Sequence, residues 1–134
     1  MAEDLNNTWI DYVPKRFAGQ VEKAFQGNPL ALKLTEELTV YRYWGGNSLE
    51  AGSPWYSLDS FMTPDVARET LALPDGNSAI NISKFILPKD TVIVLGEASP
   101  QLDNGLFGAY AEGGGIQIYV PDASAVKLVG QITK

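Results

Sequence analysis

From residue 38 onward the chain is a succession of short segments rich in β-branched and aromatic residues, separated by turns that contain glycine or proline. Such segments favour strands, because branched and aromatic side chains pack well on a pleated surface. The 13 Gly and 8 Pro of the chain agree with a turn-rich, β-rich protein. The apolar phase shifts at Phe85, which predicts a β-bulge there. We expect strands at 38–44, 55–57, 80–87, 91–95, 116–120 and 125–132.

The N-terminal region carries helical patterns instead. Pro14 suits the first position of a helix, and apolar residues recur from there at near-helical spacing until the break at Gly27–Pro29. We predict a second short helical turn over 30–37. A later helix is expected to start at Thr63–Pro64, where threonine can cap the first turn.

The length of 134 residues fits a single domain. We expect one α+β domain over 1–134, with a helical N-terminal part over 1–37 and a β-rich core over 38–134. The longest purely apolar run, Val92–Leu95, is too short for a transmembrane helix. The acidic start shows no signal-peptide pattern, so we expect any export to depend on an upstream segment or a dedicated delivery machine.

Two absences and the net charge restrict the chemistry. The chain has no Cys and no His, which excludes disulfides, thiol nucleophiles, Cys-ligated metals and a Ser-His-Asp triad. Its carboxylates show no metal-ligand spacing, so we expect no metal site. The net charge of −6 argues against binding to nucleic acids and to anionic membranes, both of which attract cations. It suits a basic protein partner, although acidic charge also serves solubility alone.

Arg42 lies in the middle of an aromatic strand segment. A guanidinium in such surroundings needs a partner, because burying an unpaired charge is costly. One interpretation is a clamp on a phosphate or carboxylate group, for which the planar guanidinium is well suited. The other is a structural salt bridge or a surface arginine on an edge strand.

The glycine run 113–115 ends a long segment, 99–115, that we expect to be a loop. Three glycines let the backbone approach a ligand closely, but the run matches neither a P-loop nor a dinucleotide-binding fingerprint. In the strand 116–120 the aliphatic residues share one face, and Gln117 and Tyr119 share the other. If the aliphatic face is core, Gln117 points into a cleft or into solvent.

The segment Trp55–Ser57 offers two stacking surfaces and a hydroxyl group. Aromatic rings of this kind can bind a planar ligand. Core packing is the commoner role of Trp and Tyr, so both interpretations stay open at this point.

The order and spacing of these segments resemble toxin domains of bacterial polymorphic toxin systems that have an ADP-ribosyltransferase-like fold. The resemblance covers residues 39–129, and four anchors carry it: 40–46, 52–57, 67–77 and 113–119. It implies a split, mainly antiparallel β core that follows the N-terminal helices and contains a cleft for NAD.

Three positions match the pattern of that superfamily. It places an arginine on its first core strand, an aromatic and hydroxyl segment on the next and a Glu or Gln on a later strand, here Arg42, Trp55–Ser57 and Gln117. The segment 113–117 is similar to that of NAD glycohydrolases of the tuberculosis necrotizing toxin type, a branch that also uses a histidine, which this chain lacks. Transferases usually carry Glu where this chain has Tyr119, so the resemblance favours hydrolysis.

The resemblance therefore implies an NAD(P)+ glycohydrolase, a toxin of interbacterial competition that depletes the cofactor in its target cell. It implies a cognate immunity protein, secretion or delivery by a larger effector, and action in the target cytoplasm. NAD(P)+ would be the substrate, without a further cofactor. The alternatives are a mono-ADP-ribosyltransferase that modifies a macromolecule and a noncatalytic β-rich binding module. The implied catalytic residues are Gln117 and Arg42, and the implied substrate-binding residues are Tyr43, Trp55, Tyr56, Ser57 and Arg68.

Overall fold

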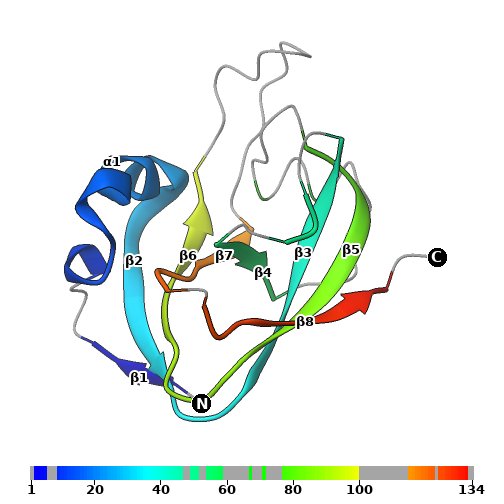
Figure 1. Cartoon of the computed structure of the whole chain (residues 1–134). Coiled ribbons are helices and arrows are strands. Elements are labelled where there is room, and N and C mark those ends of the chain that lie inside the picture. Colours follow the sequence, from blue (N-terminus) through cyan, green and yellow to red (C-terminus); the bar gives the residue numbers. More distant parts are fainter. Residues whose placement is uncertain are drawn as a thin grey trace.

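The computed structural model describes residues 2–5, 9–46, 49–51, 54–58, 67, 71, 77–99, 115–122 and 124–132. Over these residues the chain is mostly antiparallel β-sheet with one α-helix, an α+β arrangement (Figure 1). Its elements are β1 (Ala2–Asp4), the 3-10 turn η1 (Trp9–Asp11), α1 (Lys15–Ala24), β2 (Phe25–Leu34), β3 (Leu38–Gly46), β4 (Trp55–Ser57), β5 (Asn77–Leu87), β6 (Val92–Ala98), β7 (Ile116–Tyr119) and β8 (Lys127–Gln131).

The sheet has the strand order β1-β2-β6-β7-β4-β3-β5-β8, and each of these neighbouring pairs is antiparallel. Within the described residues, β3 and β4 share a single register pair, Tyr41 with Ser57. By contrast, β3 pairs with β5 along nearly its whole length. The sheet therefore consists of two halves, β1-β2-β6-β7-β4 and β3-β5-β8, which separate beyond that one pair (Figure 1). This agrees with the split, mainly antiparallel core that we expected.

The first helix is confirmed near the predicted place. α1 begins one residue later than predicted, because Pro14 is the N-cap, with φ of −53° and an extended ψ of 134°, and Lys15 is the first helical residue. Val21 and Phe25 point from this region onto Val94 of β6 and Tyr119 of β7, and all four side chains are buried. α1 therefore covers one face of the first half of the sheet (Figure 1).

The predicted helical turn over 30–37 is wrong, because residues up to Leu34 belong to strand β2. Gly27, with φ of +72°, does not mark the end of an element, because it lies within strand β2. It sits instead in a register irregularity between Gln26 and Leu30, after which β2 pairs again with β6. Residues 1–37 therefore contain the strands β1 and β2 in addition to the helix.

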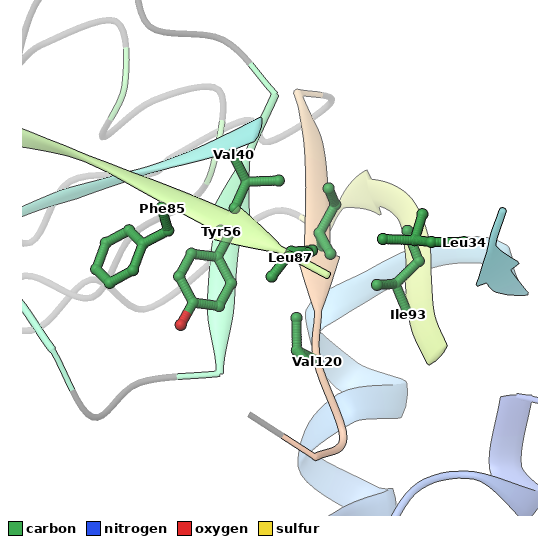
Figure 2. Packing of buried hydrophobic residues seen from close by; sticks show 8 residues of the cluster. Leu34, Val40, Tyr56, Phe85, Leu87, Ile93 and Val120 are labelled. Atoms are coloured by element: carbon green, nitrogen blue, oxygen red, sulfur yellow. The ribbon is translucent and has the colours of Figure 1, made fainter. Parts of the chain in front are cut away.

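The main core lies between the two halves of the sheet (Figure 2). Both halves contribute to it, because Val40, Phe85 and Leu87 come from one half while Ile93 and Ile118 come from the other. Leu87, Ile93 and Ile118 are almost completely buried. Burial of these side chains holds the halves together although few backbone hydrogen bonds join them.

The bulge predicted at Phe85 is confirmed in the pairing of β5 with β8, whose register shifts between Lys84 and Phe85. The pairing of β5 with β3 stays in register there, and Ser83, Phe85 and Leu87 are buried. Ile82 instead packs on the opposite face beside Tyr43, where a second, smaller cluster forms. The register of β3 and β5 shifts farther along, between Trp44 and Gly46 on β3.

The other predicted strands are confirmed as β3, β4, β6, β7 and β8, with ends displaced by a few residues. Most of the helix expected from Thr63 lies outside the described residues. Within it, Leu71 N–H donates to Ala67 O over 3.0 Å, the hydrogen bond of a single helical turn. The loop expected over 99–115 lies outside the described residues except at its two ends. None of the described helices is long and apolar enough to cross a membrane.

Candidate functional site

A pocket lies where the two halves of the sheet separate. Its volume is about 30 Å³, well below that of small-molecule sites (~300–1,000 Å³). Side chains alternate between the two faces of a strand, so residues from both faces can meet in one pocket only where neighbouring strands part. The lining residues come from β3, β4, β7 and the turn at residue 71: Tyr41, Arg42, Tyr43, Trp55, Tyr56, Ser57, Leu71 and Gln117.

Six of the seven predicted site residues therefore line the same pocket. They come from segments that are far apart in the sequence, and the pairing of β3 with β4 and of β4 with β7 brings them together. The seventh, Arg68, lies outside the described residues.

Arg42 is half-buried at the edge of the split. Its Nε donates a 2.9 Å hydrogen bond to Leu49 O, and its Nη1 makes a longer contact of 3.5 Å to Trp55 O. Both acceptors are neutral carbonyl groups, and within the described part of the chain no carboxylate pairs with the guanidinium. Burial lowers the pKa of Arg42, and the nearby Tyr56 opposes this shift. The salt-bridge interpretation thus finds no support among the described residues.

The three residues of β4 divide between the two faces of the sheet. Tyr56 packs into the main core, with its ring edge-on to Phe85 at a centroid distance of 5.0 Å (Figure 2). Burial raises the pKa of its phenol, and Arg42 opposes that shift. Trp55 points to the other face and is half-buried, and its ring lies edge-on to Tyr119 at 4.8 Å. Ser57 is buried on the same face as Trp55. The segment therefore packs in the core and also lines the pocket, and binding of a planar ligand stays a prediction.

Gln117 is buried, with 8% of its surface exposed, so the alternative in which it points into solvent is wrong. Its side chain Nε2 donates a 2.7 Å hydrogen bond to the carbonyl of Ala24, the last residue of α1. That carbonyl belongs to the helix end, where backbone acceptors lack partners within the helix. Gln117 thus holds the helix end in place and lines the pocket as well.

Two pocket residues were missed by the sequence reasoning, Tyr41 and Leu71. The signal for Tyr41 was present, because it stands two residues before Tyr43 and strand residues two apart share a face. Leu71 gave no such signal, since a leucine in a helical pattern is ordinarily core. Tyr43 itself is confirmed in the pocket, and its carbonyl accepts a 2.9 Å hydrogen bond from the Asn77 side chain.

Two further observations concern the rest of the described chain. A larger open hollow of about 400 Å³ lies at residues 88–92, 121–122 and 124–125, and it contains none of the predicted site residues. Among the described residues no group of acidic side chains could hold a metal ion.

The chain is similar in fold to a solved chain from the structure of Tse6 in complex with Tsi6. The two share 15% sequence identity with a TM-score of 0.54, and the match covers 95% of this chain and 98% of that chain. At this identity the likeness concerns the fold alone. No family model matches the sequence, and no curated protein does.

Proposed function

We propose that this chain is a bacterial toxin domain that binds NAD(P)+ and hydrolyses the bond between nicotinamide and ribose. The observation that carries the proposal is the pocket at the split of the sheet, where a cation, aromatic rings and an amide converge. These groups are Arg42, Trp55 and Gln117, three residues at the positions where the ADP-ribosyltransferase-like superfamily places its site.

The fold likeness supports the same proposal. The similar chain comes from a complex of two proteins, Tse6 and Tsi6, and the match extends over nearly the whole of both chains. We propose by analogy that this chain has a dedicated protein partner, a cognate immunity protein. The proposed toxin would be secreted or delivered by a larger effector and would act in the cytoplasm of the target cell.

The reaction breaks the bond between C1 of the ribose and the ring nitrogen of nicotinamide. The bonding electrons leave with the ring, which becomes neutral nicotinamide, while oxocarbenium-like positive charge develops on the ribose. Water adds to C1 and loses a proton, so the products are nicotinamide, ADP-ribose and H+. Because the leaving group needs no proton, a chain without histidine can carry out this step.

Four of the pocket residues have proposed roles that follow from their chemistry. The guanidinium of Arg42 binds the pyrophosphate, a group that its fork of N–H donors matches well. The rings of Trp55 and Tyr43 pack against nicotinamide. The Nε2 of Gln117 is held by Ala24, which turns the amide oxygen into an oriented acceptor for a ribose hydroxyl.

The residue type at position 119, two residues after Gln117, favours hydrolysis over transfer of ADP-ribose. In transferases of the superfamily a glutamate usually occupies that position. Here Tyr119 occupies it, and its buried ring packs edge-on against Trp55 in a cluster next to α1. A buried phenol cannot activate an acceptor as a carboxylate does, because burial raises its pKa further.

The experiment that tests the function incubates purified protein with NAD+ or NADP+ and follows free nicotinamide, with and without candidate target proteins. Release without any target is the expected result. Release or label transfer only with a target would favour the mono-ADP-ribosyltransferase. If neither dinucleotide reacts or binds, both enzymatic functions are contradicted and a noncatalytic binding module is left.

The rate of nicotinamide release should change by less than about twofold between roughly pH 6.5 and 8.5, because histidine is the only side chain whose unshifted pKa lies near this range. The chain has no histidine. Burial raises the pKa of Tyr56 above its ordinary value of 10.0, so its phenol stays neutral in this range. Arg42 stays charged, as guanidinium groups do in proteins. Rates at saturating NAD+ and constant ionic strength provide the measurement, and a bell-shaped profile within this range would contradict the assignment.

A further inference from the structure

A network of three side chains lies next to Arg42 and outside the pocket lining. Ser83 stands opposite Arg42 in the register of β3 and β5, and it is completely buried. Its hydroxyl donates a 2.6 Å hydrogen bond to Oε2 of Glu50 and accepts a 2.9 Å hydrogen bond from Nε1 of Trp44. A serine hydroxyl has one proton to donate, so its donor is committed to the glutamate.

Glu50 belongs to the short segment 49–51 that follows β3, and polar contacts hold this segment. The side chain of Leu49 is 72% exposed, so apolar packing contributes little. The carbonyl of Leu49 accepts the hydrogen bond from Arg42 Nε. The carboxylate of the next residue, Glu50, accepts the hydrogen bond from Ser83. The hydrogen bond to a carboxylate is charge-assisted and therefore stronger than one between neutral groups.

We infer that Glu50 is a positioning residue that orients the guanidinium of Arg42 toward the pocket through the carbonyl of Leu49. The inference rests on the proposed function, in which Arg42 binds the pyrophosphate of NAD(P)+. Ser83 also keeps the carboxylate occupied. Within the described residues Glu50 and Arg42 form no ion pair, so the positive charge stays available for a phosphate group.

The test compares Glu50→Ala with Glu50→Gln. The glutamine oxygen can still accept the hydrogen bond from Ser83. This variant therefore keeps that hydrogen bond and removes the negative charge. We expect Glu50→Ala to raise KM for NAD+ about tenfold with kcat changed by less than about threefold, since uniform binding is lost. Glu50→Gln should stay close to the wild type. An equal rise of KM in both variants would overturn the inference. The effect would then come from the negative charge of Glu50 and not from its hydrogen bond with Ser83.

A second readout does not need activity. The exchange of the Arg42 Nε–H proton with solvent is measurable by NMR, and the chain has only three arginines, Arg16, Arg42 and Arg68, which makes the signal assignable. This exchange should accelerate about tenfold in Glu50→Ala and stay unchanged in Glu50→Gln, because the hydrogen bond to Leu49 protects the proton. Unchanged exchange in folded Glu50→Ala would overturn the inference even if the wild type released no nicotinamide. Absent nicotinamide release alone would contradict only the proposed function.

A double-mutant cycle excludes a general structural effect. If Glu50 acts through Arg42, then Glu50→Ala should cause no further loss of activity in an Arg42→Ala background, because residues acting as one unit are not additive. A further tenfold loss would count against the inference. If Glu50→Ala fails to fold, Ser83→Ala removes the same hydrogen bond from the other side and should raise KM to a similar extent.

Discussion

Replacing Arg42 with alanine is expected to lower kcat/KM for NAD+ by about 100-fold while the protein stays folded, since hydrogen bonds from a charged group are worth about 1.5–3 kcal/mol. Arg42 is half-buried at the split of the sheet. Within the described residues its charge is not neutralised, so its removal leaves a bound pyrophosphate without its counter-charge. The measurement is the initial rate of nicotinamide release over a range of NAD+ concentrations, with circular dichroism to check the fold.

Two variants serve as controls for this prediction. Arg16→Ala removes the same charge from the exposed face of α1, where the guanidinium stacks on Phe17, and it should leave the rate unchanged. Arg42→Lys keeps the charge but loses the fork of donors, so its activity should lie between those of the wild type and of Arg42→Ala. If Arg42→Ala retained wild-type activity, the pyrophosphate role would be disproved.

Replacing Gln117 with alanine is expected to lower kcat/KM by about 30-fold or more, because an oriented hydrogen-bonding group at the ribose is lost. Stability should fall by only about 1 kcal/mol, the typical net contribution of one neutral hydrogen bond. The carbonyl of Ala24 keeps a second partner, because the backbone N–H of Ser99 donates to it over 2.8 Å. Nicotinamide release and urea denaturation measure the two effects separately.

Gln117→Glu separates the two ends of the amide. The carboxylate still offers an oxygen to the ribose but loses the donor to Ala24, so we expect it to be less stable than Gln117→Ala and more active. Gln131→Ala is a matched control, because this exposed glutamine of strand β8 donates to Asn81 of β5 and does not line the pocket. Loss of activity in strict proportion to loss of stability across the variants would show that Gln117 acts only through the helix end.

The strands and several site residues could be predicted from the sequence because their signals are local. Alternating aromatic and β-branched residues identified β3, and the same pattern identified β7. The resemblance then selected Arg42 and Gln117, and the structure places both in one pocket. Their chemical roles stay predictions until the variants are measured.

Strand β2 could not be recognised from the sequence. Its Gly27 and Pro29 are ordinary signals for the end of an element, and only pairing with β6 shows that the strand continues through an irregularity. Glu50 gave no signal either, since a glutamate after a strand is ordinarily solvated. Its contact with Ser83 joins residues 33 positions apart in the chain.

The sequence by itself determined which residue types were available for chemistry and where the strands from residue 38 onward lie. Residue types are fixed by the chain, and strand patterns depend on neighbours two positions away. Only the tertiary structure decided that β3 and β4 part after one residue pair, which brings side chains from both faces into one pocket. It also decided that Gln117 holds the end of α1. Both depend on contacts between segments distant in sequence, which no local pattern specifies.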